Sequence, residues 1–494
     1  MRLRRLGIDT YRQPVVYMRA DCPVCRAEGF EALAMVEVHL GEHSIVAVLN
    51  VVTSDLLARD EASLSEVAWA ALGAKDGDRV TFAHPPTLES FRHVRGKMYG
   101  ERLDEAALEA IVGDVRAGRY TDAHVGAFLA ACAGDHLDVG EITSLTRAMV
   151  RAGERLRWDA RVVLDKHCVG GLPGNRTTPI VVAIVAAAGW TIPKTSSRAI
   201  TSPAGTADTM ETMAPVDLDL GAMRRVVERE GGCVVWGGAM GLSPVDDVLI
   251  RVEQPLDLDS RGQLVASILS KKLAAGATHV LIDVPWGPTA KVRGAEAAAA
   301  LARDLREVGE TLGLAVRVVE TDGRQPVGRG VGPALEARDV LAVLRGDPDA
   351  PADLRDRAVA LAGEVLQLVP GTAPGAGRML ARDLLADGRA WRKFVAICEA
   401  QGGLREPPRA PWTQPVVARY AGRVAAIDNR RLARAAKLAG APKAAAAGLV
   451  LHAPLGTEVL AGQPLYTLHA EAPGELEYAL AYAARHPDVV RVVP

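Results

Sequence analysis

A short stretch of the chain combines charged residues, glycines and a helix start in the order that an anion site needs. Residues 162–179 read VVLDKHCVGGLPGNRTTP. The apolar residues predict a strand, the glycines predict a turn, and Thr178 followed by Pro179 predicts the cap and first position of a helix. Such a turn points free backbone N–H groups at one place, where Lys166 and Arg176 add positive charge. The sequence therefore predicts a binding site for an anion, and phosphate fits best.

The glycine turn matches no common nucleotide-binding motif. It lacks the Gly-Lys-Ser/Thr ending of a Walker loop, and its glycines do not have the spacing of a dinucleotide fingerprint. By itself the turn is also consistent with a purely structural role. The case for phosphate therefore depends on the other polar stretches of the chain.

A second polar stretch precedes the next predicted helix. Residues 194–206 read KTSSRAITSPAGT and gather several hydroxyls around two cations. Hydroxyls and an arginine suit the oxygens of phosphate and ribose. An exposed Ser/Thr loop in which Thr206 caps a helix is the alternative.

A third group of residues could contact a nucleobase. Arg251 precedes Ser267 and Lys271, which are four residues apart and share one face of a helix. These three side chains could contact the carbonyls and the ring nitrogen of a base. A solvated cationic helix end is the alternative.

Alternating strands and helices are predicted to position these stretches. Strand-like runs occupy residues 162–164, 233–236, 279–284 and 315–319, and residues 294–309 form an alanine-rich helix. This alternation predicts a mostly parallel or mixed sheet with helices on its faces. Ligands of such sheets bind at the carboxyl ends of strands, where the turn at 170–174 would lie.

The whole chain is predicted to be a multidomain α/β protein. Its 494 residues exceed what one ordinary hydrophobic core supports. The predicted parts are a small N-terminal β-rich domain (1–86), a helical bundle domain (92–156, completed by about 245–275), a large α/β phosphate-binding domain (157–405) and a C-terminal α+β module (412–494).

Composition excludes several classes of partner. The net charge of -2 gives no basic surface for nucleic acid or an anionic membrane. The longest apolar run, 180–190, is shorter than the roughly 20 residues of a membrane span. No apolar signal core follows the basic N-terminus, so we expect a cytoplasmic protein. Cys22 and Cys25 form a close pair without a second pair at zinc-site spacing, and we expect two reduced thiols and no metal.

Taken together, the three stretches resemble the thymidine phosphorylase/pyrimidine-nucleoside phosphorylase family, and more closely its longer branch (type 2), which includes the archaeal AMP phosphorylases. The predicted N-terminal β-rich domain fits that branch. The matching segments are 165–175, 194–206, 267–272, 286–291 (WGPTAK) and 332–336 (GPALE).

This resemblance implies a glycosyltransferase of the pentosyltransferase class. Such an enzyme would catalyse reversible phosphorolysis of a nucleoside or a nucleoside 5′-monophosphate, giving free base and (deoxy)ribose 1-phosphate or ribose 1,5-bisphosphate. Inorganic phosphate would be a co-substrate, and no cofactor is implied. The family also implies a homodimer, formed through the helical domain, or a larger homo-oligomer.

The resemblance assigns roles to individual residues. His167 would face the base, and Asp259 matches the proton donor of the AMP branch, whose loss should be visible in the rate. The implied phosphate contacts are Lys166, Cys168, Gly170, Ser196 and Thr206. The implied nucleoside or nucleotide contacts are Gly171, Ser197, Arg198, Ala199, Ile200, Thr201, Ser202, Arg251, Ser267, Lys271 and Lys291.

Two departures from the family pattern bear on substrate binding. Cys168 stands where the family usually has serine, and a thiol is a weak donor, so phosphate affinity should be lower unless the backbone compensates. His167 should not activate Cys168 as a nucleophile, because adjacent side chains of an extended segment point in opposite directions. The stretch 197–202 is not the glycine-rich version of the thymidine-specific branch, which argues against thymidine itself.

Two other functions fit parts of the sequence. A phosphoribosyltransferase of similar fold would use a pyrophosphate-bearing sugar and Mg²⁺, for which Asp208 and Glu211 are the candidate ligands. A non-catalytic nucleotide-binding protein would explain Cys168 as a sign of lost activity, but the presence of Lys166 and His167 argues against it.

Overall fold

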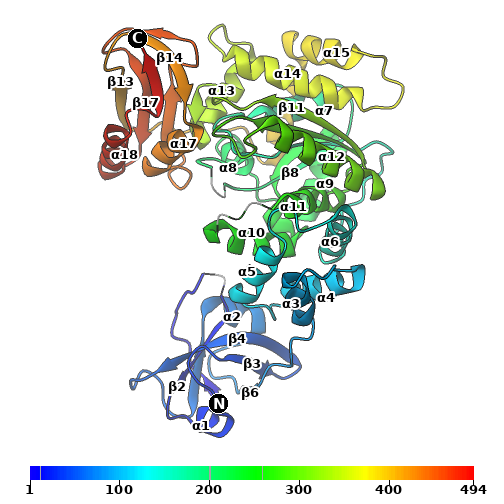
Figure 1. Ribbon diagram of the computed structural model, residues 1–494, viewed down its shortest axis with the longest axis vertical. Coiled ribbons are helices and arrows are strands. Elements are labelled where there is room, and N and C mark those ends of the chain that lie inside the picture. The colour runs from blue at the N-terminus through cyan, green and yellow to red at the C-terminus, as the bar shows by residue number, and fades with distance from the viewer. Residues whose placement is uncertain (12, 200–201, 257, 259) are drawn as a thin grey trace. The chain divides into compact units, whose positions relative to one another are not determined.

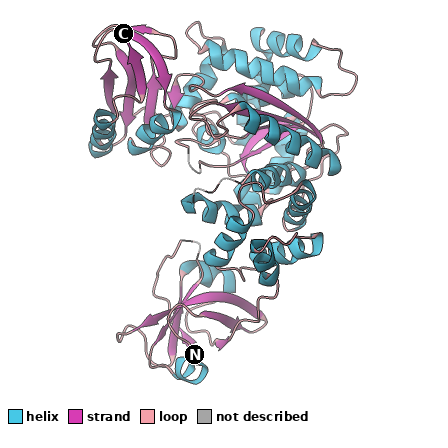
Figure 2. Ribbon diagram, viewed as in Figure 1, coloured by secondary structure: helices cyan, strands magenta, loops and turns pink. Residues whose placement is uncertain are grey.

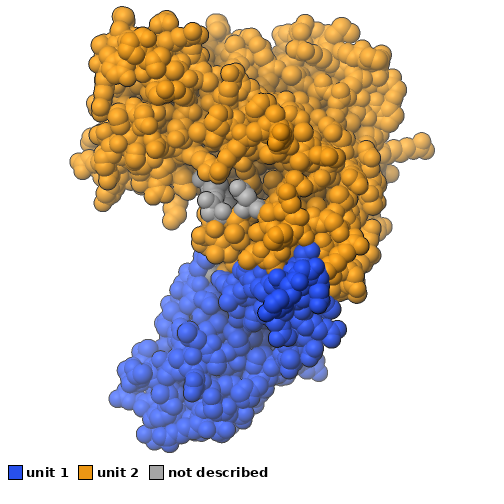
Figure 3. Space-filling model, in the orientation of Figure 1, with its two compact units in different colours: residues 1–101, 110–128 blue, residues 102–109, 129–494 orange. Residues whose placement is uncertain are grey.

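The computed structural model describes residues 1–494 apart from 12, 200–201, 257 and 259. The chain forms two compact units, which are coloured separately in Figure 3. One unit comprises residues 1–101 and 110–128, and the other comprises 102–109 and 129–494. Asp259, Ile200 and Thr201, to which the sequence assigns roles, lie outside the described residues.

The first unit contains the predicted β-rich domain, a six-stranded sheet in the order β1-β5-β2-β4-β3-β6 (Figure 1). Its inner face buries Val16, Met18, Leu49 and Leu64. Cys22 and Cys25, its Cys-X-X-Cys pair, form no disulfide in the described structure, and their reduced state stays a prediction. The elements within residues 1–101 of this unit are β1 Arg2–Leu3, β2 Val15–Arg19, α1 Pro23–Glu28, β3 Met35–Leu40, β4 His43–Val52, β5 Glu61–Leu64, α2 Glu66–Leu72, β6 Thr81–Ala83 and α3 Phe91–Met98.

A group of helices follows in the chain. The helix α11 packs closely against α6, because Gly262 leaves room for Leu137 and Ile142 at the contact. This packing places the Ser267/Lys271 face of α11 in the same unit as the α/β sheet. The helices are α4 Glu105–Arg116, α5 Asp122–Ala131, α6 Val139–Arg151, α10 Pro244–Leu256 and α11 Arg261–Ala274.

The central sheet is parallel, as the alternation predicted. Two hydrogen-bonded groups, β11-β10-β7 and β8-β9, are joined by a bridge between Val163 and Thr191. In the resulting order β9-β8-β7-β10-β11, strands β8 and β9 are added on one side of β7, and β10 and β11 are added on the other. The strand order therefore reverses between β7 and β10, although all the strands are parallel. Ligands of open α/β sheets bind at such a reversal, outside the carboxyl ends of the strands. The strands are β7 Leu164–Cys168, β8 Ile192–Ser196, β9 Gly232–Trp236, β10 His279–Trp286 and β11 Ala315–Asp322.

Helices cover both faces of this sheet (Figure 2). One face carries α7, which is buried along almost its whole length against α14 and α16. The other face carries α12, which packs on β10, β11 and α11. The helices of this domain are α7 Thr177–Ala187, α8 Thr206–Glu211, α9 Leu220–Glu230, η1 Gly237–Met240, α12 Ala295–Thr311, α13 Pro333–Arg345, α14 Ala352–Gln367, α15 Ala376–Ala386 and α16 Arg389–Gln401.

Two boundaries and one strand in this domain differ from the sequence predictions. The strand expected at 162–164 runs instead from Leu164 to Cys168, because its charged side chains find buried partners. The strand β8 was not predicted. The helix expected to be capped by Thr178 and to begin at Pro179 begins two residues earlier, at Thr177, with Arg176 at the N-cap position. Thr178 and Pro179 therefore lie within the first turn, where proline is tolerated because those N–H groups lack helical partners.

The C-terminal module has its own core, which includes Leu449, Tyr466, Leu468 and Val490. One strand of its larger sheet comes from the α/β domain, since β12 pairs with β15 through Gly330–Val450 and Val331–Leu449. The module's elements are β12 Gly330–Val331, β13 Trp412–Val417, β14 Gly422–Ile427, α17 Asn429–Leu438, β15 Gly448–Leu451, β16 Glu458–Val459, β17 Pro464–Ala470, α18 Pro473–Arg485 and β18 Val490–Val493.

No helix in the described part of the chain is both long enough and apolar enough to cross a membrane.

Candidate active site

The strand β7 presents two different sets of polar side chains on its two faces. Asp165 contacts Lys272 from α11 on one face, and Lys166 contacts Thr177 from α7 on the other. Side chains alternate along a strand, so His167 shares the face of Asp165 and Cys168 shares the face of Lys166. This separation is the one that the sequence predicted.

The Lys166 face has the chemistry of an anion site. Lys166 is fully buried, and its Nζ donates a 2.8 Å hydrogen bond to Thr177 Oγ1. Asp283 lies opposite Cys168 in β10, and its Oδ2 is 3.9 Å from Lys166 Nζ. Thr321 donates a 2.6 Å hydrogen bond to the other oxygen of Asp283. Because an ammonium has three N–H donors, Lys166 keeps donors for a bound phosphate after bonding Thr177.

The side chain of Cys168 is a protonated thiol, which is a poor nucleophile. Asn175 Nδ2 lies 3.5 Å from its sulfur. Burial raises the pKa of Cys168 to about 11, and the nearby Asp283 carboxylate adds to this effect. A thiolate is the reactive form of cysteine, and His167 lies on the opposite face of the strand. The structure therefore agrees with the expectation that His167 does not activate Cys168.

The glycine turn after β7 fits a backbone that must approach a ligand closely. Gly170 and Gly171 have φ of +85° and +79°, which side chains other than glycine rarely adopt. A Cβ at Gly170 would meet open space, whereas a Cβ at Gly171 would collide with Lys291. The structure thus brings Gly171 and Lys291 together, two residues predicted to contact the nucleotide.

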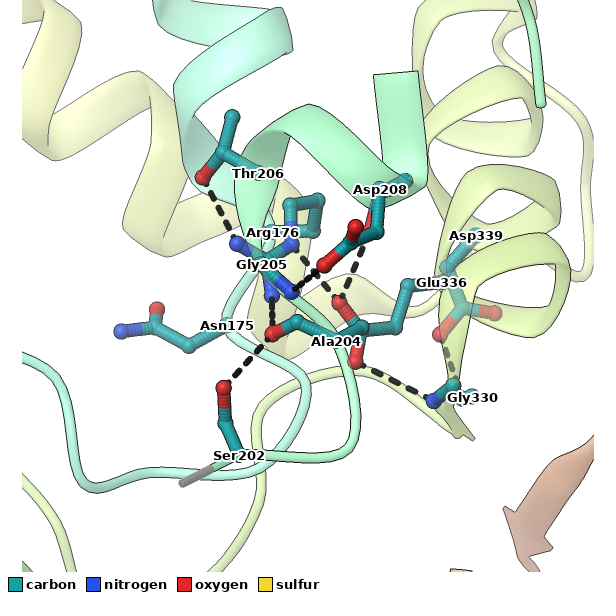
Figure 4. A network of polar contacts seen from close by, with 12 residues as sticks. Asn175, Arg176, Ser202, Ala204, Gly205, Thr206, Asp208, Gly330, Glu336 and Asp339 are labelled. Atoms are coloured by element: carbon teal, nitrogen blue, oxygen red, sulfur yellow. Dashed lines mark hydrogen bonds and ion pairs between the residues drawn. The ribbon is translucent and has the colours of Figure 1, made fainter. Parts of the chain in front are cut away.

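Arg176 connects the glycine turn to the stretch 194–206 (Figure 4). It donates 2.7 Å and 3.0 Å hydrogen bonds to Thr206 Oγ1 and Ala204 O. Its Nε also donates a 2.7 Å hydrogen bond to Glu336 of α13, which is buried. Cys168, Asn175, Arg176 and Thr206 therefore form one connected wall.

Beside this wall, Asp208 holds the two described parts of the stretch, 194–199 and 202–206, together. Asp208 Oδ2 accepts hydrogen bonds of 2.6 Å and 2.8 Å from the backbone N–H groups of Ala199 and Gly205. The Ser202 hydroxyl donates a 2.9 Å bond to Ala204 O. Ser196 ends β8, and its buried hydroxyl has no hydrogen-bond partner among the described residues. A free buried hydroxyl fits its predicted role as a phosphate contact.

The side chain of Arg198 is engaged by acidic residues. Its guanidinium contacts Glu211 at 2.5 Å and 3.0 Å and Asp217 at 3.4 Å, and it stacks over Trp236. The hydrogen bonds of Glu211 raise the pKa of Arg198 further, and the guanidinium of Arg198 in turn lowers the pKa of Glu211. A nucleotide contact through this guanidinium stays a prediction.

Arg198 also binds Asp208 and Glu211, the two carboxylates that the phosphoribosyltransferase alternative would use to bind Mg²⁺. Asp208 bonds two backbone N–H groups and lies 3.4 Å from Arg198, and Glu211 bonds Arg198 through both oxygens. No cluster of three or more His, Cys, Asp or Glu side chains suited to a metal occurs within the described ranges. The donor set at this position therefore does not fit the phosphoribosyltransferase alternative.

The His167 face is rich in ammonium groups. Lys194 and Lys272 lie 3.2 Å and 2.7 Å from the two oxygens of Asp165. Burial raises the pKa of Asp165, but these ammonium groups outweigh it, and the net pKa lies below its usual range. Burial likewise lowers the pKa of Lys272, which Asp165 partly restores.

His167 is a neutral imidazole in this setting. Burial is the largest cause that lowers its pKa well below 6.5, and the ammonium groups of Lys272, Lys194, Lys271 and Lys166 add to it. A neutral imidazole can donate one hydrogen bond and accept another. It can therefore contact a base carbonyl without itself carrying charge.

The predicted base contacts on α10 and α11 lie near this face. Lys271 forms a 2.6 Å ion pair with the buried Asp246 of α10, and it is close enough to His167 to influence its pKa. Ser267 lies one turn before Lys271 on α11, and Arg251 lies on α10. Lys271 therefore lies on the side of His167, and base contacts by Ser267 and Arg251 stay predictions.

Comparison with known proteins identifies the family. The helical bundle domain of the glycosyl transferase family matches residues 93–153, and the a/b domain of that family matches residues 160–391. The pyrimidine nucleoside phosphorylase C-terminal domain matches residues 423–486. A relative named "Putative thymidine phosphorylase" from Polaromonas sp. (strain JS666) is 66% identical over 493 residues, which span 100% of this chain and 96% of the relative. The chain belongs to the thymidine/pyrimidine-nucleoside phosphorylase family.

Other relatives also match this chain over almost its whole length. "Putative thymidine phosphorylase 1" from Acidovorax sp. (strain JS42) is 63% identical over 100% of this chain and 96% of its own. A "Putative thymidine phosphorylase" from Legionella pneumophila (strain Corby) is 58% identical over 99% and 95%. Among solved structures, anthranilate phosphoribosyltransferase from Thermus thermophilus aligns with a TM-score of 0.51 at 21% identity. That alignment covers 62% of this chain and 98% of the other, and it shows a shared fold.

Sequence analysis did not identify several buried polar residues around the candidate active site. Each lies in a fully buried position and pairs with another polar group. A charged residue inside an apolar run was the available signal, as in Ile282-Asp283-Val284. The missed residues are Asp165, Asp246, Lys272, Asp283 and Glu336.

Proposed function

We propose that this protein catalyses the reversible phosphorolysis of a nucleoside or a nucleoside 5′-monophosphate, as a pentosyltransferase. One observation carries the proposal: β7 ends at the reversal of the sheet with Lys166 on one face and a neutral His167 on the other. An anion on the first face and a base on the second would meet at the carboxyl end of one strand. The membership of the family supports this function.

The reaction would proceed by attack of a phosphate oxygen on the anomeric carbon. The new C–O bond forms as the glycosidic C–N bond breaks, and the electron pair of that bond leaves with the base. Lys166, the amides of Gly170 and Gly171, Ser196 and Thr206 would hold the phosphate. His167, Arg251, Ser267 and Lys271 would stabilise the negative charge that develops on the base.

Which base leaves, and whether the sugar carries a 5′-phosphate, are separate questions. The names of the relatives support thymidine, whereas the resemblance to the longer branch supports AMP. A purine would need a proton on its ring nitrogen, for which Asp259 is the predicted donor. The exposed Lys291 beside Gly171 would be a suitable contact for a phosphorylated sugar.

A substrate panel tests the proposal. Thymidine, uridine, cytidine, adenosine and their 5′-monophosphates are each incubated with inorganic phosphate, and free base is measured. Release of base from any member that requires phosphate supports the function, and the member cleaved fastest defines the substrate. If no member is cleaved, the proposal fails. Reaction of a free base with a pyrophosphate-bearing sugar, dependent on Mg²⁺, would instead support a phosphoribosyltransferase.

We also propose a homodimer or a larger homo-oligomer, with phosphate as co-substrate and no other cofactor. The basis is the resemblance to the family, whose members associate through the helical domain. Light scattering on the purified protein measures the mass in solution, and the mass of one chain would contradict this assembly. A cytoplasmic location stays a prediction from the sequence.

A further inference from the structure

We propose that Arg176 and Glu336 are positioning residues for phosphate, which act together to fix the loop that ends in Thr206 against the glycine turn. This inference rests on the proposed function. Neither residue was among the contacts implied by the family resemblance, and both lie in the wall of the site.

Arg176 is placed where the two phosphate loops meet. It follows the glycine turn directly and precedes the first residue of α7. Its two terminal nitrogens, Nη1 and Nη2, hold Thr206 Oγ1 and Ala204 O, which belong to the other loop (Figure 4). The distance between the two loops is therefore set by one planar guanidinium.

Glu336 fixes the orientation of that guanidinium. Its Oε2 accepts from Arg176 Nε at 2.7 Å and from Thr209 Oγ1 at 3.3 Å, and its Oε1 accepts from Gly332 N at 3.2 Å. Thr209 lies in α8, one turn after Thr206. A single carboxylate thus ties the end of the glycine turn to the helix that begins with Thr206.

The glycine turn is held from its other side by the segment before α13. Asn175 N donates a 2.9 Å hydrogen bond to Val327 O, and Gly174 packs against the same carbonyl. Asp339 accepts bonds of 2.6 Å and 2.7 Å from the backbone N–H groups of Arg329 and Gly330. The carboxylates of α13 therefore support both edges of the turn.

A positioning role follows from the donors that Arg176 has already used. Three of its five N–H donors are engaged by Glu336, Thr206 and Ala204, which holds its plane fixed. A lysine would retain the charge but could not span three acceptors from one nitrogen. Breaking the pair should therefore loosen the contact to phosphate while leaving the base face of β7 unchanged.

Two conservative variants test the proposal, Glu336→Gln and Arg176→Lys. Phosphate KM, nucleoside KM and kcat are measured for each, together with the phosphate Kd by calorimetry. We expect phosphate KM and Kd to rise on the order of 10-fold or more, as for loss of a buried charge-assisted hydrogen bond. Nucleoside KM should stay within about twofold, and kcat should fall less than phosphate affinity, because Thr206 would bind phosphate before and during reaction.

The double variant and a matched control sharpen the test. If the two residues act as one unit, Glu336→Gln with Arg176→Lys should cost no more than the worse single change. Glu230→Gln is the control, because Glu230 is also buried in the α/β domain and pairs with Lys393 at 3.0 Å outside the site. It should leave phosphate KM unchanged.

Several outcomes would overturn the proposal. These are an unchanged phosphate KM in folded Glu336→Gln, equal rises in phosphate and nucleoside KM, or additive losses in the double variant. A loss in Arg176→Lys without one in Glu336→Gln would indicate direct phosphate contact by Arg176 instead. If Glu336→Gln does not fold, Glu336→Asp, which keeps the charge but shortens the reach to Arg176 Nε, is judged by the same criteria. If the wild-type protein binds phosphate in calorimetry but releases no base, the proposed function is contradicted. The positioning proposal is then still tested by the phosphate Kd of the variants.

Discussion

The two faces of β7 differ in how their charges are balanced. On the Lys166 face, one ammonium faces one carboxylate, Asp283, at 3.9 Å, which is longer than a hydrogen bond. On the other face, the ammonium groups of Lys194 and Lys272 share the single carboxylate of Asp165. The first arrangement leaves donors available to an anion, whereas the second leaves an excess of positive charge beside His167.

This difference explains how one strand can serve two halves of a reaction. Burial, together with the excess positive charge, keeps His167 neutral, and that charge would also attract the negative charge that develops on a leaving base. The Lys166 face is closer to neutrality, so we expect a phosphate bound there to use the glycine amides and the N-terminus of α7 as well, which directly follows the turn. The alternation of side chains along a strand keeps the two sets apart.

The largest expected effect comes from removing the ammonium of the phosphate face. Lys166→Met keeps most of the volume and removes the charge, and we expect kcat/KM for phosphate to fall by about 100-fold or more. The KM for the nucleoside should change little. Steady-state kinetics with varied phosphate measures this, and Lys393→Met, at an ion pair outside the site, is the control. An unchanged phosphate KM would remove Lys166 from the site.

The matching change on the other face should produce the opposite pattern. His167→Gln removes the imidazole but not the phosphate contacts, so kcat/KM for the nucleoside should fall by roughly 10- to 100-fold with phosphate KM unchanged. The same kinetic experiment measures it with varied nucleoside. A rise in phosphate KM of similar size would show that the two faces are not independent.

The pH dependence of stability tests whether His167 is neutral. Its folded pKa lies below the unfolded value near 6.5, so below that pH the unfolded chain binds a proton that the folded chain does not. The free energy of unfolding should therefore fall as pH falls below 6.5, by about 1 kcal/mol per pH unit from this group. Chemical denaturation at pH 7.5 and 5.5 should show a larger loss for wild type than for His167→Gln.

The comparison with His167→Gln cancels the contributions to stability of other groups that titrate in the same pH range. Burial raises the pKa of Glu336 to about 7, but this residue is present in both proteins and cancels. Equal losses of stability in the two proteins would contradict the neutral, depressed imidazole.

The smallest effect is expected at Cys168. Cys168→Ser supplies a stronger donor at the same place, so phosphate KM should fall by about two- to fivefold. Cys168→Ala, which removes the group altogether, should leave phosphate KM near the wild-type value if the thiol contributes little. Kinetics with varied phosphate measures both variants, and a higher phosphate KM in Cys168→Ser would show that the thiol itself fits the site better.

Local sequence was sufficient for the parts of the site that follow one another along the chain. The residues from Leu164 to Thr178 contain the strand, the glycine turn and the helix start, and the period of two separates His167 from Cys168. Spacing of four placed Ser267 and Lys271 on one face of α11. These features depend on the backbone preferences of a few neighbouring residues, which can be predicted from residue types and spacing alone.

Only the tertiary structure could decide the partners of the charged side chains. Arg176 meets Glu336 across 160 positions of sequence, and Asp165 meets Lys272 across 107. Such pairs form because α11 packs on α6 and α12, and α13 packs on α7 and α8. This packing depends on apolar contacts distributed over the whole domain. The sequence by itself therefore determined which groups could bind phosphate and base, and the fold decided which carboxylate holds each cation and at which face of β7 it acts.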